Sequence, residues 1–224
     1  MMSPVTSDPA DLHAPASLAE SLRDTIRRQI VTTVLHPGDL LLEKSLAAEF
    51  GVSKTPVREA LQMLVVEGWI TLIPRRGYAV SSMGFNDIRE VMHLRQILEP
   101  AAASAAAAAT SPDLRADLEG LLEEQISAPT APQAVDAAHR FHRRIAVAAR
   151  NKRALRILES LWAETARAHR LLPPLATYIG ADSERSAHRD VLDAIGAGDP
   201  ERAGAVMAAH LAEAEAEMVR AFYR

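Results

Sequence analysis

Apolar side chains recur at helical spacing throughout residues 86–224, and no segment of that stretch alternates in the way that a half-buried strand does. Alanine makes up about a fifth of the chain, which favours helices and lets them approach closely. Short turns, such as the Gly- and Pro-containing turn at 196–200, separate the periodic segments. The sequence therefore predicts about six helices in an antiparallel bundle.

Residues 17–80 follow a different pattern, in which helical segments give way to a β-hairpin. Helices are expected where apolar residues repeat every three or four positions, at about 18–34, 43–50 and 54–67. The β-rich runs 69–73 and 78–80 then flank a Pro-Arg-Arg-Gly turn, as the strands of a hairpin do. Helices followed by such a wing predict a winged helix-turn-helix, so the expected fold class is mainly α.

The expected domain boundaries follow these changes of pattern. Residues 1–16 hold three prolines and show no periodicity, so we expect a flexible tail. The winged helix-turn-helix domain then spans 17–80, a linker spans 81–85, and the helical domain spans 86–224.

Composition excludes several classes of protein. The absence of cysteine excludes a disulfide scaffold, a thiolate metal site and cysteine catalysis. No uncharged run is long enough to span a bilayer, and the first residues lack the pattern of a signal peptide, so we expect a cytoplasmic protein without a membrane partner. A net charge of −4 gives no general attraction to nucleic acid, which leaves any such binding to local motifs.

The densest local motif lies at residues 51–61. Gly51 permits a sharp turn between two helices, and the second helix carries Lys54, Thr55 and Arg58 in its first turns. That end of a helix meets base edges when the helix lies in a major groove, where arginine can donate two hydrogen bonds to guanine. The alternative is a set of solvated charges on an ordinary helix, but the preceding turn and the following wing favour DNA binding.

Further cations surround this motif. Arg75, Arg76 and Gly77 form the expected tip of the wing, where cations suit a minor groove and glycine lets the backbone approach. Lys44, near the start of the preceding helix, is suited to a backbone phosphate. For Arg75 and Arg76 taken alone, solvated surface charges explain the sequence equally well.

At these residues the sequence resembles the GntR family of bacterial transcription regulators. The resemblance is carried by Pro37-Gly38, by the 51–61 motif, by Glu67-Gly68-Trp69-Ile70 and by residues 74–80. It implies that operator DNA is contacted by Lys44, Lys54, Thr55, Arg58, Arg76 and Gly77. Lys54 stands where the family usually has arginine, and lysine keeps the charge but loses the bidentate fork.

Three histidines, His142, His188 and His210, lie on apolar stripes of separate expected helices in the second domain. The turn at 196–200 joins the last two of these helices, and His188 and His210 stand within roughly one helical turn of the same height. Two inward histidines at one level, with a third from another helix, can chelate a divalent cation. The residues alone give equal weight to hydrogen-bonded core histidines.

The same helices resemble the FCD effector domain, the ligand-sensing partner of the GntR domain in the FadR subfamily. The resemblance lies in residues 95–99, 141–145, 148–151, 188–195, 198–199 and 210–211. It implies a divalent metal, zinc first with nickel or manganese as alternatives, held by the three histidines. Ala138 replaces the family's aspartate four residues before the first histidine, so water or an effector carboxylate would complete the site.

Arg95 lies on the apolar side of its helix, between Val91 and Leu98. One interpretation is an intrahelical ion pair with Glu99. The other is an anchor for the carboxylate of an effector.

Three functions fit these observations to different degrees. The first is a homodimeric transcription regulator, such as a repressor, whose affinity for double-stranded operator DNA responds to a small organic acid. The second is an effector-independent DNA-binding protein whose bundle serves only dimerisation. The third is a three-histidine metallohydrolase, but the sequence offers no general base beside the metal and the winged domain would have no use, so we do not expect an enzyme.

Overall fold

The computed structural model describes residues 17–223, and the predicted flexible tail at 1–16 lies outside this range. The described chain divides into two compact units. The first contains residues 17–30 and 34–82, and the second contains residues 31–33 and 83–223.

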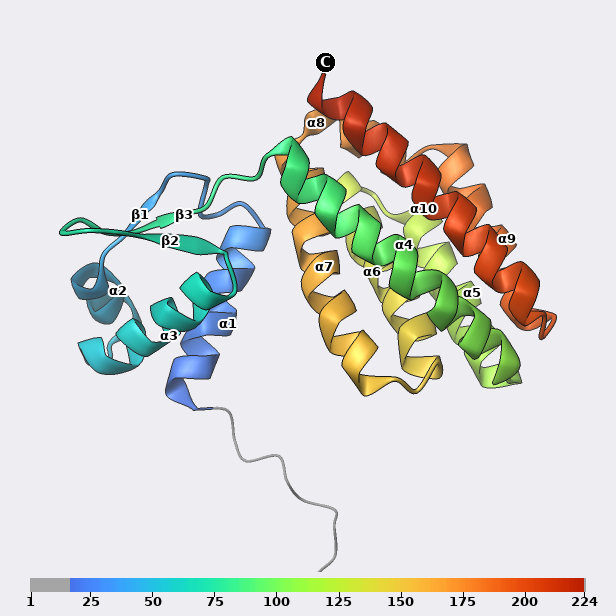
Figure 1. Cartoon of the computed structure of the whole chain (residues 1–224), viewed down its shortest axis with the longest axis horizontal. Helices are drawn as coiled ribbons and strands as arrows, with labels where there is room; N and C mark the ends of the chain where they lie inside the picture. The colour runs from blue at the N-terminus through green and yellow to red at the C-terminus, as the bar shows by residue number, and fades with distance from the viewer. Residues whose placement is uncertain (1–16, 224) are drawn as a thin grey trace, which may run out of the picture. The chain divides into compact units, whose positions relative to one another are not determined.

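The first unit combines three helices with a small sheet (Figure 1). In chain order its elements are α1 (Leu18–Val31), β1 (Leu40–Leu41), α2 (Glu43–Phe50), α3 (Lys54–Val66), β2 (Ile70–Ile73) and β3 (Gly77–Val80). A capping box starts α1: the Glu20 backbone N–H donates to Ser17 Oγ, and the Ser17 N–H donates to the Glu20 carboxylate. This order of helices and strands confirms the predicted winged helix-turn-helix.

The sheet has the antiparallel order β1-β3-β2. Strands β2 and β3 form the predicted hairpin, with Ile70 opposite Val80 and Ile73 opposite Gly77. Strand β1 was not expected, because two residues between a turn and a helix are too few to show alternation. It pairs Leu40 with Ala79 on the free side of β3.

The second unit is a bundle of seven helices (Figure 1). They are α4 (Phe85–Ala108), α5 (Pro112–Ser127), α6 (Ala131–Ala148), α7 (Lys152–Leu171), α8 (Pro173–Ile179), α9 (Asp182–Gly196) and α10 (Pro200–Phe222). The predicted all-helical bundle is confirmed, with one helix more than the six or so expected, and α8 is the shortest of the seven. Two prolines begin α8, since proline fits the first turn of a helix.

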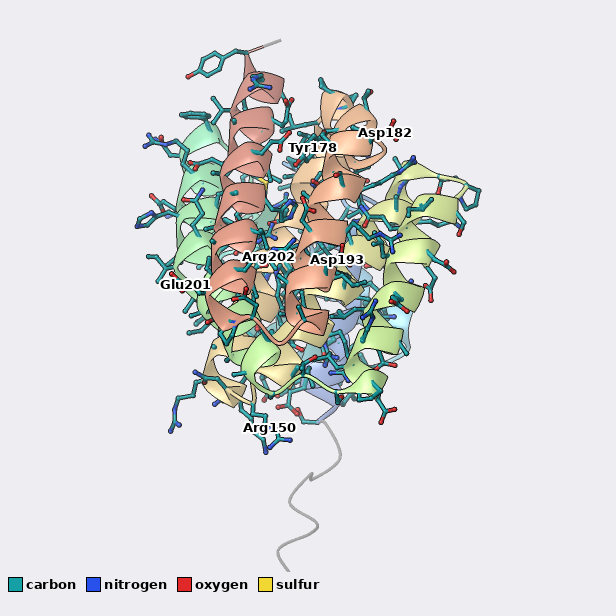
Figure 2. The ribbon with its side chains drawn as sticks, turned by 90° about the vertical axis from the view of Figure 1, so that its right-hand side faces the viewer. Arg150, Tyr178, Asp182, Asp193, Glu201 and Arg202 are labelled. Atoms are coloured by element: carbon teal, nitrogen blue, oxygen red, sulfur yellow. The ribbon has the colours of Figure 1, made fainter. Side chains whose placement is uncertain are left out.

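Helix α4 packs against α6, α7, α9 and α10. Figure 2 shows α9 and α10 side by side, with Asp182 and Asp193 marking the length of α9 and Glu201 the start of α10. Fully buried apolar side chains from several helices, including Met92, Leu118 and Phe141, form the core. Among residues 17–223, no helix combines the length and apolar character needed to cross a membrane.

Candidate functional site

The N-terminal end of α3 presents the residues predicted to read DNA. Gly51 adopts a left-handed conformation (φ 66°) that ends α2 and turns the chain into α3. Val57 and Leu61 fix the inner face of α3 in the core, which leaves Lys54, Thr55 and Arg58 exposed. A continuous outward surface of cationic and polar groups at a helix start suits a nucleic-acid backbone or base edge.

Arg58 is paired across the helix-turn-helix. Its Nε donates to Glu43 Oε1 at 2.9 Å and its second guanidinium nitrogen to Oε2 at 2.7 Å. Hydrogen bonding to Arg58 lowers the pKa of Glu43, and the same contact raises the pKa of Arg58. Because the Arg58 side chain is 56% exposed, the pair is a surface ion pair that a stronger partner can displace.

The other residues predicted to contact DNA divide into two groups. Arg75 and Arg76 are exposed at the hairpin turn, and Lys44 is exposed on the first turn of α2. Gly77, by contrast, has a local structural role: its φ is +101°, and a Cβ there would lie 2.8 Å from the Leu41 backbone oxygen. Glycine at this position lets β3 approach β1 closely.

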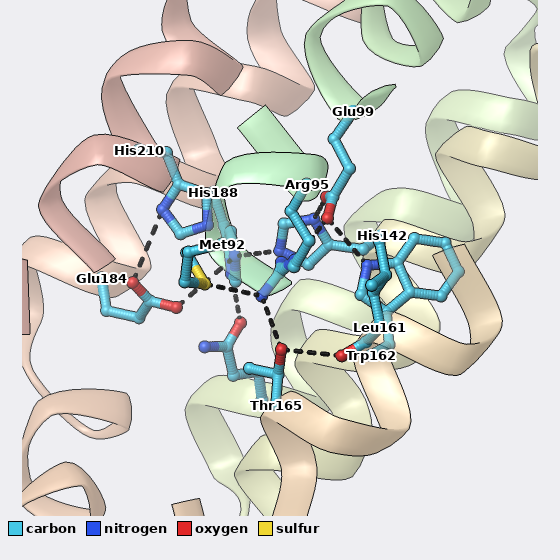
Figure 3. Close-up of polar contacts among 11 residues, drawn as sticks. Met92, Arg95, Glu99, His142, Leu161, Trp162, Thr165, Glu184, His188 and His210 are labelled. Atoms are coloured by element: carbon cyan, nitrogen blue, oxygen red, sulfur yellow. Dashed lines mark hydrogen bonds and ion pairs between the residues drawn. The ribbon is translucent and has the colours of Figure 1, made fainter. Parts of the chain in front are cut away.

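The three histidines of the bundle meet in its interior (Figure 3). His142 comes from α6, His188 from α9 and His210 from α10, and one ligand atom from each lies within 4.8 Å of the others. All three are buried, with His188 fully so. His142 Nε2 and His188 Nε2 are only 3.1 Å apart.

Acceptors fix the other ring nitrogen of two of these histidines. Glu99 Oε2 lies 2.5 Å from His142 Nδ1, and Gln125 Oε1 lies 2.6 Å from His188 Nδ1. Both Nδ1 atoms must therefore donate, which leaves two Nε2 lone pairs facing each other. A proton or a metal cation between them removes the repulsion. Outer acceptors on ligand histidines are the usual support of a metal site.

Glu99 contacts three other side chains of this polar cluster. Besides His142, its carboxylate accepts from Arg95 Nε at 2.5 Å and from Trp162 Nε1 at 2.8 Å. Burial would raise the pKa of Glu99, but the charges and hydrogen bonds of Arg95 and His142 outweigh it and hold the pKa well below its usual range. Glu99 is therefore ionised in the folded protein.

Arg95 makes the intrahelical pair that one interpretation of the sequence expected. It is 4% exposed and also donates to Thr165 Oγ1 at 3.3 Å. It nevertheless lines a cavity beside the histidines, so the pair does not remove it from the site.

That cavity has a volume of about 30 Å³, room for no more than about two water molecules. Its wall combines apolar side chains, among them Ala138, with the polar or titratable side chains of Arg95, His142, Tyr178, Glu184 and His210. As it stands, the cavity accommodates an ion with water rather than an organic molecule.

Burial favours the neutral form of two of the three histidines, His188 and His210. It is the largest cause that lowers the pKa of His188 well below its usual range, and with His142 and Arg95 it lowers the pKa of His210 to about 3. Neutral imidazoles are the protonation state that binds metal ions.

Sequence reasoning missed Glu184, Glu99 and Gln125 as parts of the site. Glu184 had a signal, because it precedes His188 by four residues and so shares its helix face. No sequence pattern indicated Gln125, because it lies on α5 and contacts His188 only where the two helices pack together.

Comparisons with known proteins agree with this architecture. Residues 18–80 match the model of bacterial regulatory proteins of the gntR family, and residues 90–213 match the FCD domain. The chain is 30% identical over 199 residues to a "Probable D-xylose utilization operon transcriptional repressor" of Paenarthrobacter nicotinovorans, covering 88% of this chain and 86% of that protein.

Two solved structures share the fold. McbR/YncC of E. coli has a TM-score of 0.76 and 24% identity, over 92% of this chain and 98% of that one. A GntR regulator from Rhodococcus sp. RHA1 has a TM-score of 0.78 and 24% identity, over 92% and 99%. Matched families and relatives are regulators rather than enzymes. The chain therefore belongs to the GntR family of bacterial regulatory proteins, as a transcription regulator that combines a GntR domain with an FCD domain.

Proposed function

We propose that this regulator binds operator DNA as a homodimer and that a small carboxylate, acting at a metal-containing site in the bundle, sets its affinity for DNA. The observation that carries the DNA half is the exposed start of α3, where Lys54, Thr55 and Arg58 face outward after a tight turn. Two such helices about one DNA turn apart would read a pseudopalindrome.

In this proposal Arg58 and Lys54 contact base edges or phosphates, while Thr55 and Lys44 contact the backbone. Arg75 and Arg76 at the exposed hairpin turn supply cations to an adjacent groove. Gly77 acts indirectly, because its close approach to β1 fixes the position of that turn.

The residues at the centre of the bundle fit a divalent cation. His142, His188 and His210 offer three nitrogen ligands, and two of their outer nitrogens are held by Glu99 and Gln125. Nitrogen-rich sites of this kind favour zinc, with nickel or manganese as alternatives. When bound, such a cation supplies a positive charge that attracts a carboxylate.

A small organic acid is the effector class that the cavity wall favours. Arg95 lines the cavity and donates from Nε to Glu99, and a guanidinium beside the cavity has further N–H groups with which to bind an anion. Because the cavity holds only about 30 Å³, the acid must displace water or widen the space between helices. An acid that binds one arrangement of the bundle more tightly than another would shift the population of DNA-competent molecules.

The DNA half is tested with Arg58→Ala in the full chain, using a duplex selected from random sequences by the unaltered protein. We expect Arg58→Ala to weaken binding roughly tenfold or more while metal content stays unchanged. Arg143→Ala is the matched control, because Arg143 is 55% exposed and pairs with Glu159 much as Arg58 pairs with Glu43. An unimpaired gel shift for Arg58→Ala would contradict the proposal.

The effector half is tested by a thermal-shift screen of small carboxylic acids, with and without a chelator. We expect at least one acid to raise the unfolding temperature and the chelator to remove that effect. If no acid shifts the transition, effector-independent DNA binding becomes the better proposal.

A further inference from the structure

Glu184 is a buried carboxylate in surroundings that suit a bound cation. It lies on the first turn of α9, is 5% exposed, and has one oxygen, Oε2, without a hydrogen bond. Each of its oxygens lies near a histidine: Oε1 is 3.6 Å from His188 Nε2, and Oε2 is 3.5 Å from His210 Nδ1 (Figure 3). The His210 Nδ1 atom is also buried without a hydrogen bond.

These separations match those between two atoms bound to one metal ion. Ligands 2.0–2.2 Å from a tetrahedral cation lie about 3.4 Å from each other. Three pairs of atoms have nearly this separation: His142 Nε2 and His188 Nε2 at 3.1 Å, His188 Nε2 and Glu184 Oε1 at 3.6 Å, and Glu184 Oε2 and His210 Nδ1 at 3.5 Å.

Helix geometry explains why α9 can supply two ligands. Glu184 and His188 are four residues apart, so their side chains project from one face of the helix. Helix α6 supplies only His142 to the three-histidine group, and Ala138, four residues before it, lines the same cavity with a methyl group. Helix α9 therefore supplies to this cavity a carboxylate that α6 does not supply at position 138.

We propose that Glu184 is the fourth protein ligand of the divalent cation held by His142, His188 and His210. This rests on the metal site of the proposed function. The resulting site has three nitrogen ligands and one carboxylate, whose Oε1 faces His188 and whose Oε2 faces His210. An effector carboxylate then binds by displacing Glu184 or by contacting Arg95 beside it.

The competing role for Glu184 is that of a simple hydrogen-bond acceptor for His210. Glu184→Gln separates the two, because glutamine keeps an acceptor of the same shape but loses the anionic ligand. Glu213→Gln is the matched control: Glu213 lies three residues after His210, yet its side chain is exposed. Ala138→Asp, added to Glu184→Gln, offers a carboxylate from α6 instead.

The experiment measures zinc affinity by competition with a chromogenic chelator, and the visible spectrum with cobalt(II), in the full chain. We expect Glu184→Gln to weaken zinc binding roughly tenfold or more and to change the cobalt(II) bands, while Glu213→Gln stays within about twofold. Ala138→Asp should restore affinity to the Glu184→Gln protein. Unchanged affinity and spectrum in Glu184→Gln, with normal zinc binding by the unaltered chain, would overturn the inference alone.

Failure of the unaltered chain to bind zinc or cobalt(II) would instead overturn both the inference and the proposed metal site. A second measurement needs no variant. Infrared difference spectra on adding zinc to the unaltered protein should contain a shifted carboxylate stretch, and its absence would also overturn the role of Glu184.

Discussion

Replacing Glu99 with glutamine should destabilise the helical unit severely, because Glu99 is the counter-ion of a buried arginine. Arg95 and Glu99 side chains are 5% and 3% exposed, and their closest atoms are 2.5 Å apart. Glutamine keeps the shape but removes the negative charge, which leaves the Arg95 charge buried and uncompensated. His142 also loses the ionised acceptor of its Nδ1 proton.

The size of the effect follows from this burial. Breaking a buried ion pair by removing one partner costs about 3–5 kcal/mol. A unit of this size loses about 3 °C of Tm per kcal/mol, so Glu99→Gln should lower the Tm by roughly 9–15 °C. Adding Arg95→Met removes the stranded charge, so the double variant should be more stable than Glu99→Gln alone.

The assay is thermal unfolding followed by Trp162 fluorescence. A Trp69→Phe background makes the signal specific to the bundle, because the chain has only two tryptophans. A chelator in all samples keeps metal binding out of the comparison. Costs that simply add in the double variant, or a Glu99→Gln cost under about 1 kcal/mol, would refute the buried-pair interpretation.

Three further outcomes are expected. Glu43→Gln frees Arg58 and should strengthen binding to selected DNA by up to about fivefold in fluorescence anisotropy; weaker binding would show that Glu43 assists DNA binding. Gly77→Ala should lower the stability of the first unit by roughly 1–3 kcal/mol in calorimetry, whereas Gly120→Ala, with open space around it, should not. Burial raises the pKa of Glu164 to about 7, so the folded protein favours the protonated carboxyl. The contribution of this group to the free energy of unfolding is therefore complete below about pH 4.5 and is lost as the pH rises through 7. Glu164→Gln should remove up to about 3 kcal/mol of that dependence in denaturant titrations, and an unchanged pH profile would contradict it.

Periodic apolar patterns predicted most of the fold because they are local. The helices, the hairpin around Pro74 and the turn at Gly51 each depend on residues within a few positions of one another. Strand β1 was not predicted. Its two residues are extended because they pair with β3, which lies far along the chain.

The site was predictable where helix faces determined it. His142, His188 and His210 lie on apolar stripes, and packing brings them together as the stripes require. Contacts between distant residues were not predictable in the same way. The Glu43–Arg58 pair depends on the angle between two helices.

Glu184 was missed for a different reason. Its spacing from His188 placed it on the same helix face, but charged side chains on a helix are normally solvated, so burial of this carboxylate was not expected. Its burial becomes understandable only with the histidines of α9 and α10 around it.

The most direct test of ligand-controlled DNA binding is the Kd of the zinc-loaded protein for its selected duplex, measured with and without the acid identified by thermal shift. We expect the Kd to change roughly fivefold or more, since coupling between sites typically amounts to 1–3 kcal/mol. Equal Kd values at saturating acid, with binding of that acid to the bundle verified, would contradict control of DNA binding by the helical unit.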